Sequence, residues 1–201
     1  TRVSGGTLQA GVATVAGVSG AFGINSAVTV DSGAILDITG YDTEIGSLTG
    51  GGATGGNVIL GANTLTIGSD TTSPAAYAGI ISGTGGLTEI GVGTLTLSGT
   101  NTYSGLTKVA GGVLSCSSPD SLGGGALAIT TGGLLDLNYV GNRNVASLTL
   151  DGVLQPNGIY GSSSSPATTG DNVHFTGTGT GTVTVGAVIP PPALGFAPNG
   201  D

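Results

Sequence analysis

Short runs of alternating apolar and hydroxyl-bearing side chains, separated by glycines, extend along most of the chain. The clearest example is residues 83–114, where apolar residues recur at period two in Leu95-Thr96-Leu97 and in Val109 to Leu114. A period of two buries one face of a strand and leaves the Thr and Ser face in water. Glycine accepts the positive φ angles of tight turns. The pattern therefore predicts many short strands joined by glycine-rich turns.

A glycine followed within a few residues by Leu or Ile recurs at intervals of about 19 to 30 residues. Each unit is too short to bury its own apolar face, but stacked units share a continuous core, as in solenoids and β-helices. We therefore expect a stack of short β coils. The units are Gly6-Thr7-Leu8, Gly33-Ala34-Ile35, Gly61 to Leu65, Gly93-Thr94-Leu95, Gly112-Val113-Leu114, Gly133-Leu134-Leu135 and Gly152-Val153-Leu154.

A longer repeat is superposed on the short one. Residues 1–8 match residues 107–114, and residues 27–33 match residues 126–132, so the offset falls from about 106 to about 99. We place an insertion of about seven residues near Val12 to Gly20, in a loop or a widened coil. Because residues 1–8 repeat only the second half of the unit at 83–114, we expect an uncapped first coil with strand edges open to another chain.

The last part of the chain differs in composition. We predict that β-helix repeats occupy residues 1–155 and that a hairpin or loop and a terminal strand occupy residues 156–185. The hairpin is expected around Pro156-Asn157-Gly158, because Asn-Gly suits a tight turn. Residues 186–201 contain four prolines and are expected to form an extended tail.

The amino-acid composition limits which residues can form the core and which partners the chain can bind. Glycine supplies 42 of 201 residues, aromatic residues are 4%, and strong helix formers are scarce, so an aliphatic β core is expected. Only 7% of residues are charged, the net charge is -8, and the basic side chains are Arg2, Lys108 and Arg143. This composition argues against nucleic acid and anionic membranes as partners. Sparse charge also removes one defence against edge-to-edge association.

Cys116 is the single cysteine, so no internal disulfide forms. Alternation from Leu114 places its thiol on the buried face, and an intermolecular bridge or a reactive thiol is the alternative. No apolar run is long enough to span a membrane as a helix, and no basic segment of a signal peptide opens the chain. If the protein is exported, we expect this sequence to be a mature or trimmed form.

The repeat resembles a known family. The segments GVGTLTLSG at 91–99, NTYSGLT at 101–107 and GGVL at 111–114 are similar to the autotransporter-associated β-strand repeat, with Leu106 where the family has glycine. The resemblance covers roughly residues 1–155. It implies an all-β fold, a right-handed parallel β-helix, here with an irregular C-terminal hairpin and an extended Pro-rich tail. It also implies export as a precursor to the surface of a Gram-negative bacterium, as a stalk, passenger or fibre.

The chain offers few residues for catalysis. His174 is the single histidine, no Gly-x-Ser-x-Gly motif is present, and we expect His174 to be a surface or interface residue on a terminal strand. Asp37 and Asp136 occupy equivalent outward positions, but their spacing along a solenoid separates them by several coils, too far for a glycosidase pair. A β-helical polysaccharide enzyme is therefore the least favoured hypothesis. We predict no catalytic residues.

The acidic residues and the tyrosines of the chain could form a metal site or a sugar-binding surface. Asp31, Asp42, Glu44 and Asp120 could supply oxygen ligands to calcium, but the Gly-Gly-x-Gly-x-Asp repeat of calcium-bound rolls is missing, so solvated acids are favoured. We predict no metal site and no cofactor. The tyrosines Tyr41, Tyr103 and Tyr139 are expected to pack over glycine-rich corners, with a sugar-stacking or subunit-contact surface as the alternative.

The sequence favours a self-assembling extracellular structural protein over two other functions. In this hypothesis, subunits stack end to end into a filament or surface fibre, and the C-terminal strand or tail docks on a neighbour. The alternative is an adhesin or stalk segment of a larger surface protein that binds glycan or a host surface. The predicted partners are copies of the chain and a surface glycan, without nucleic acid or membrane insertion. The predicted interface residues are Thr1, Val3, Leu8, Phe175, Val183, Val185, Ile189, Pro191, Leu194 and Phe196.

Overall fold

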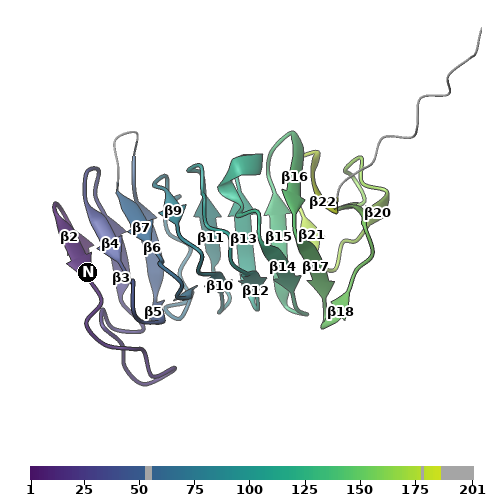
Figure 1. Cartoon of the computed structure of the whole chain (residues 1–201). Coiled ribbons are helices and arrows are strands. Elements are labelled where there is room, and N and C mark those ends of the chain that lie inside the picture. The colour runs from purple at the N-terminus through teal and green to yellow at the C-terminus, as the bar shows by residue number, and fades with distance from the viewer. Residues whose placement is uncertain (53–55, 178, 187–201) are drawn as a thin grey trace, which may run out of the picture.

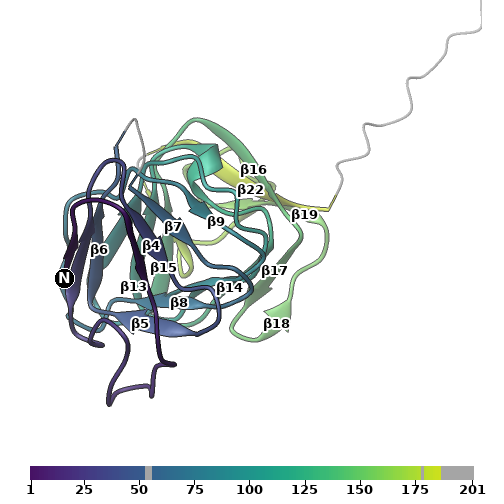
Figure 2. The same ribbon diagram turned by 60° about the vertical axis from the view of Figure 1, so that its left-hand side comes forward.

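The chain winds around one long axis as a parallel β-solenoid of about six turns, as the repeat pattern predicts (Figure 1). The computed structural model describes residues 1–52, 56–177 and 179–186. Figure 2, turned by 60°, shows the strands arranged around a common interior. Each turn has three sides, which we call sides 1, 2 and 3 in the order in which the chain meets them.

Side 1 is a column of parallel strands interrupted at one level. Tyr77 occupies that level and makes parallel bridges to Gly50 on one side and Leu97 on the other. The strands, in order of stacking, are β1 (Arg2–Val3), β3 (Ala27–Val30), β6 (Ser47–Gly50), β11 (Thr94–Leu97), β13 (Gly112–Cys116), β15 (Gly133–Leu137) and β21 (Phe175–Thr176).

Side 2 consists of two four-stranded groups separated by a short 3₁₀ helix. The first group is β2 (Thr7–Gln9), β4 (Ile35–Asp37), β7 (Asn57–Ile59) and β9 (Ile81–Ser82). The helix is η1 (Pro119–Ser121). The second group, in spatial order, is β16 (Gly141–Val145), β22 (Gly181–Val185), β19 (Gly158–Gly161) and β20 (Thr169–Gly170).

Side 3 is the most regular. Its seven strands are β5 (Thr43–Ile45), β8 (Leu65–Ile67), β10 (Leu87–Glu89), β12 (Thr107–Val109), β14 (Ala126–Ile129), β17 (Ser147–Leu150) and β18 (Val153–Leu154). Leu65, Leu87, Thr107, Leu127 and Leu148 are register partners, and they are 22, 20, 20 and 21 positions apart. A coil of about 20 residues therefore sets the repeat.

Inward side chains of successive coils stack into ladders that form the core. On side 1, Cys116 lies between its register partners Leu97 and Leu137, and all three are at most 2% exposed. Buried apolar residues from Val3 to Val185 form one continuous cluster. Burial of each such aliphatic side chain contributes roughly 1.5 to 3 kcal/mol, so these ladders supply a core to a chain that is poor in aromatic residues.

The longer sequence repeat does not follow the sides of the solenoid. Residues 27–33 begin on side 1 with β3, whereas their counterparts at 126–132 begin on side 3 with β14. Residues 7–8 lie on side 2 in β2, whereas residues 113–114 lie on side 1 in β13. The two copies are thus displaced by one side. All three sides require the same short strand with an inward aliphatic and a turn, so one sequence pattern serves any of them.

The predicted insertion is confirmed as a loop. Residues 11–26 form no named strand, and Val15 and Ser19 close a small antiparallel bridge within them. Thr14 reaches back to side 3, where its hydroxyl accepts a hydrogen bond from the backbone N–H of Glu44 at 2.9 Å. The loop therefore takes the place of a side 3 strand in the first coil.

The C-terminal hairpin turns at a different position from the one predicted. Strand β17 pairs antiparallel with β18 through Thr149–Leu154 and Leu150–Val153, around a turn at Asp151–Gly152. Both turn residues have positive φ, 49° and 80°, as a type I′ hairpin requires. At the predicted Pro156–Gly158, strand β19 instead pairs with β22. Of the predicted tail at 186–201, all residues after Gly186 lie outside the described part of the chain. No helix among the described residues is long and apolar enough to cross a membrane.

Candidate functional site

The turn NTYSGLT at residues 101–107 forms a corner of the solenoid in which an asparagine replaces a strand. Asn101 is 3% exposed and bridges two coils. Its Oδ1 accepts a hydrogen bond from the N–H of Ile81 at 2.8 Å, and its Nδ2 donates to the carbonyl of Ser121 at 2.6 Å. A side-chain amide has a donor and an acceptor, as a peptide group has. Asn101 therefore continues side 2 between β9 and η1, where no strand forms.

Tyr103 fills the same corner. Its ring is buried and packs against Gly123, where a Cβ atom would overlap the ring. Its hydroxyl is 2.8 Å from the Oγ1 of Thr107, and burial raises the pKa of the phenol to about 12. The prediction that this ring packs over a glycine-rich corner is confirmed.

The other two tyrosines differ from each other. Tyr139 is 6% exposed, packs close to Gly181 and donates to the carbonyl of Thr182 at 3.1 Å, so it also covers a glycine. Tyr41 is 40% exposed. It remains a candidate for the predicted sugar-stacking or contact surface.

Several predicted interface residues belong to the chain's own core. Phe175, Val183 and Val185 are at most 4% exposed, and β21 and β22 join sides 1 and 2 of the same chain. Their strands find partners within the chain, so these side chains present no surface to a neighbour. Val3 is likewise buried at 5%.

Two predicted interface residues remain accessible. Thr1 is exposed and Leu8 is partly buried. The remaining predicted interface residues lie outside the described part of the chain: Ile189, Pro191, Leu194 and Phe196.

His174 is buried and forms two ion pairs within the chain, so the prediction that it is a surface or interface residue is wrong. Its side chain is 8% exposed. Nδ1 lies 2.7 Å from Oδ2 of Asp171, and Nε2 lies 3.1 Å from Oδ2 of Asp151. Two carboxylate partners engage both ring nitrogens, an arrangement that favours the imidazolium. Asp151 is the turn residue of the β17–β18 hairpin and also accepts hydrogen bonds from the backbone N–H and, at 2.7 Å, the hydroxyl of Thr131.

The pKa values of the three groups shift in the directions expected for mutual stabilisation. Burial lowers the pKa of His174, but the hydrogen bonds and charges of Asp171 and Asp151 outweigh it and raise the pKa above its usual value. Hydrogen bonds from Thr131, and then from His174, lower the pKa of Asp151. Burial raises the pKa of Asp171, and the bonds from His174 and Val173 more than reverse that effect. The cluster fastens the hairpin to the 171–177 segment, and we call it the His174 clamp.

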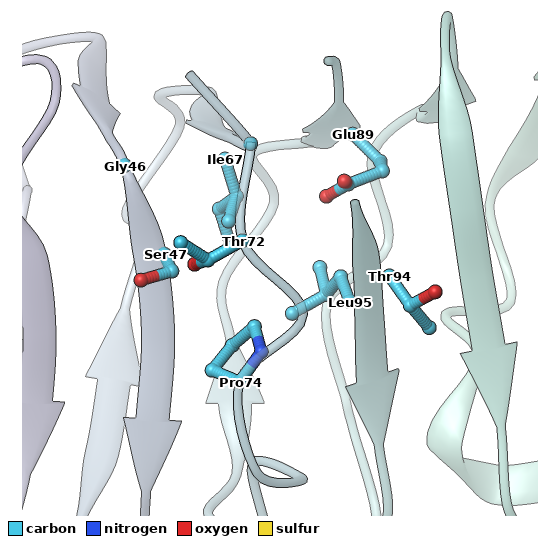
Figure 3. A pocket seen from close by; sticks show the side chains of 9 residues that line it. Gly46, Ser47, Ile67, Thr72, Pro74, Glu89, Thr94 and Leu95 are labelled. Carbon is cyan, nitrogen blue, oxygen red and sulfur yellow. The ribbon is translucent and has the colours of Figure 1, made fainter. Parts of the chain in front are cut away.

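A second polar group lies inside the solenoid at the corner between sides 3 and 1 (Figure 3). Glu89 is 1% exposed, although it is a carboxylic acid, and burial together with the charge of Asp70 raises its pKa to about 9. It lines a small cavity of about 10 Å³, together with Gly46, Ser47, Ile67, Gly68, Thr72, Pro74, Thr94 and Leu95. At pH 7 the side chain is therefore a neutral acid.

The acids considered for calcium do not come together. Asp31 pairs with Arg2 at 2.8 Å, and Asp120 pairs with Arg143 at 3.1 Å. Asp42 and Glu44 line one groove with Thr14 and other residues. Across residues 1–52, 56–177 and 179–186, no group of three or more His, Cys, Asp or Glu side chains could hold a metal ion.

Asp37 and Asp136 do not form a carboxylate pair. Asp37 lies on side 2, where its Oδ2 accepts a bond from Gln9 at 3.2 Å. Asp136 lies on side 1, where its Oδ2 accepts a bond from the hydroxyl of Ser115 at 2.7 Å. Different sides and different coils separate them, as the spacing predicts.

Cys116 is fully buried, and burial raises the pKa of its thiol to about 12. We expect a thiol reagent such as DTNB to leave the native protein unmodified at pH 8 and to label one thiol per chain in guanidinium chloride, because the thiolate is the reactive form. Absorbance of the released thionitrobenzoate measures both. Rapid labelling of the native chain would instead support the reactive-thiol alternative.

The comparisons with known proteins bear on the same segment. Residues 87–115 match the passenger-associated transport repeat. These 29 of the 201 residues are similar to one copy of that repeat. The matched residues run from β10 through β13 and contain Asn101, Tyr103 and Thr107 of the corner described above. The resemblance noted from the sequence is confirmed.

One curated relative is the adhesin BmaC autotransporter of Brucella suis biovar 1 (strain 1330). It is 52% identical over 83 residues, which are 41% of this chain and 2% of the adhesin. The matched part is thus a small fraction of that protein's length. No solved structure matches the chain significantly.

The sequence indicates the position of one of these buried polar groups but not of the other. Leu87-Thr88-Glu89 alternates, so period two places Glu89 inward beside Leu87, and this inference could have been drawn from the sequence. The meeting of Asp151 and Asp171 with His174 has no such signal. It depends on how the chain folds back after β18, which the repeat pattern does not describe.

Proposed function

We propose that this chain is a rigid stalk segment in the exported passenger of a Gram-negative surface adhesin. The observation that carries the proposal is the passenger repeat at 87–115, which is continuous with the rest of one solenoid. The similarity to an autotransporter adhesin supports surface location.

The geometry suits a spacer. Stacked strands about 4.8 Å apart give the seven strands of side 3 a length of roughly 29 Å. Each coil contacts its neighbours through backbone hydrogen bonds and inward ladders, so the element resists bending. A stalk needs this stiffness and no catalytic group.

The experiment distinguishes a spacer from a domain that itself binds a host cell or a glycan. The full chain is inserted between an epitope tag and an outer-membrane anchor on a laboratory Gram-negative strain, and the same purified chain is coated on beads. We expect the tag to move outward by about the length of the solenoid, and the beads to bind host cells and glycan arrays no better than albumin-coated beads. Saturable binding of the coated beads would contradict the stalk proposal and would indicate that the chain itself is an adhesin.

End-to-end self-assembly is a second candidate, favoured by one feature. Strand β18 is at the edge of side 3, and its Val153 and Leu154 are 63% and 68% exposed. An exposed apolar edge strand can pair with a strand of another chain. If the chain self-assembles in this way, light scattering and negative-stain microscopy should detect fibres whose amount rises with protein concentration. The Leu154→Lys variant should form no fibres. Under the stalk proposal alone, the wild-type chain stays monomeric.

A further inference from the structure

The outward face of side 3 carries one column of side chains. In each strand, the residue between two inward-facing side chains points away from the core, and register pairing stacks these residues in successive coils. The column contains one acidic and one basic residue, three coil intervals apart, and the other members are uncharged. In order, the column is Glu44, Thr66, Thr88, Lys108, Ala128 and Thr149.

Glu44 lies in an acidic groove at the first end of this column. The groove has a volume of about 230 Å³, and it is lined by Thr14, Ala16, Asp42, Thr43, Glu44 and Thr66. Glu44 is 8% exposed, and among the described residues its carboxylate has neither a hydrogen bond nor an ion pair. Asp42 is exposed, and its Oδ1 accepts a hydrogen bond from the N–H of Thr64 at 2.7 Å. Two acids thus share a groove that no basic side chain of the described residues lines.

Lys108 lies at the other charged position of the column. Two of the three basic side chains of the sequence are paired, Arg2 with Asp31 and Arg143 with Asp120, whereas Lys108 has no ion pair among the described residues. Its register neighbours in the column are uncharged. Stacked strands lie about 4.8 Å apart, so three intervals separate Lys108 from Glu44 by roughly 14 Å. The two charges therefore do not meet within one chain.

A two-fold axis brings these charges together between two copies. The axis stands perpendicular to side 3, midway between Thr66 and Thr88, and it reverses the order of the column in the second copy. Glu44 then faces the partner's Lys108, and Lys108 faces the partner's Glu44. Thr66 faces the partner's Thr88, where two hydroxyl groups can hydrogen-bond. The column is thus complementary to itself in charge, as an isologous contact requires.

We propose that two copies of this chain associate side by side, side 3 against side 3, as a two-fold dimer in which Lys108 of each copy enters the acidic groove of the other. The flexible four-carbon stem of lysine allows its ammonium group to reach into the groove. The next column residue, Ala128, faces the partner's loop at 11–26 and leaves room for it, because its side chain is a single methyl group.

A second copy accounts for both unpaired charges. A basic segment of another protein could fill the groove but would leave Lys108 without a partner, whereas the two-fold arrangement pairs both groups twice. The contact closes on itself, so it yields a dimer and not a fibre. The proposal goes beyond the stalk function and does not depend on it, because a monomeric solenoid would displace the epitope tag by the same length.

The expected dimer is weak. Only outward side chains of a few coils and the loop meet, so the interface is small and we expect a dissociation constant on the order of 10 to 100 µM. Salt screens charges at an accessible interface. Sedimentation equilibrium of the purified chain should therefore show dimers in about 50 mM NaCl, and a dissociation constant at least roughly tenfold higher in about 500 mM NaCl.

Charge reversal tests the pairing. Lys108→Glu places two acids opposite each other, and Glu44→Lys places two cations there, so each variant alone should dimerise at least roughly tenfold more weakly than the wild type. An equimolar mixture of the two variants restores every opposite pair and should form a heterodimer. The double variant Glu44→Lys/Lys108→Glu should form a homodimer again. If Glu44→Lys fails to fold, as judged by circular dichroism, Asp42→Lys replaces it in the same groove.

Two control variants should keep the wild-type dimer. Asp37→Lys makes the same change of charge as Glu44→Lys, but on side 2. Leu154→Lys alters β18, which lies at the far edge of side 3 and beyond the paired positions. Loss of the dimer in Leu154→Lys together with retention in Lys108→Glu would indicate association through the strand edge and would contradict the proposal.

The remaining outcomes also decide the matter. Salt-sensitive dimers that the single reversals weaken and the mixture restores support the proposal. A wild-type chain that stays monomeric in low salt up to roughly 500 µM, well above the expected dissociation constant, overturns it. Single variants that lose the dimer but do not recover it on mixing also overturn it, because the charges then do not pair across the interface.

Discussion

Replacing Gly105 by alanine is expected to lower the thermal midpoint of the chain by roughly 6 to 12 °C, equivalent to about 3 kcal/mol for a protein of this size. Gly105 is the glycine of the NTYSGLT corner. A Cβ at this position would overlap the carbonyl group of Gly85 in the coil below, and a Cβ on Gly125 would overlap Gly105 in the same way. The clash is with backbone atoms, which cannot rotate away, so the coils themselves must separate.

The matched control is Gly5→Ala. No atom lies within 4 Å of a Cβ built on Gly5, and its φ is not positive. The control should therefore change stability by no more than about 0.5 kcal/mol. Circular dichroism during heating and in urea, with the same probe for both variants, makes the comparison. Equal losses in both variants would show that glycine acts through chain flexibility and not through stacking.

The repeating part of the fold can be predicted from the sequence because every coil needs the same short strands with inward aliphatic side chains, followed by turns. Alternation correctly placed Cys116 inside, and glycine spacing indicated stacked coils. Because the three sides of the solenoid have similar sequence patterns, the sequence does not predict which side a given strand occupies. Since β3 and β14 present the same pattern from different sides, a match between their sequences could not tell which side each one occupies.

The C-terminal end depends on competing local signals. Asp151-Gly152 and Asn157-Gly158 both have hairpin chemistry. Asp151 adopts the turn because its carboxylate also binds Thr131 and His174, contacts that appear only once the fold exists. Gly158 instead begins β19, which pairs with β22.

The position of Glu89 likewise depends on both local and distant information in the chain. Alternation alone predicts an inward Glu89. Its convergence with Asp70 and Ser47 requires the register of three successive coils, which depends on the lengths of the intervening turns and not on any motif.

Removing the His174 clamp should make the stability of the chain less dependent on pH. The charge-assisted bond from His174 to Asp171 is worth about 1.5 to 3 kcal/mol, and the bond to Asp151 adds to it. We expect His174→Gln to lower the thermal midpoint at pH 5.5 by at least roughly 3 °C, because an uncharged amide replaces an imidazolium between two carboxylates.

The sign of the pH effect follows from the shifted groups. His174 has a raised pKa, so its stabilisation is complete below its ordinary value of 6.5 and is lost as the pH rises through the higher folded value. Asp151 and Asp171 have lowered pKa values, so their stabilisation is present above the ordinary value of 3.8 and is lost as the pH falls through the folded values. The clamp is therefore strongest between about pH 4 and 6.5.

Glu89 also makes the thermal midpoint depend on pH. The experiment therefore measures the difference between the midpoints of the wild type and of His174→Gln at each pH. The pKa of Glu89 is raised from 4.5 to about 9, so Glu89 too makes the chain less stable as the pH rises over that range. Subtracting the midpoints of His174→Gln from those of the wild type, from pH 4.5 to 9, cancels this contribution. The difference should be largest near pH 5.5 and shrink as the imidazolium loses its proton. Asp120→Asn, which breaks only the exposed pair with Arg143, should keep the wild-type profile. A difference that stays constant across the range would mean that His174 is held as a neutral ring and that the clamp acts by packing.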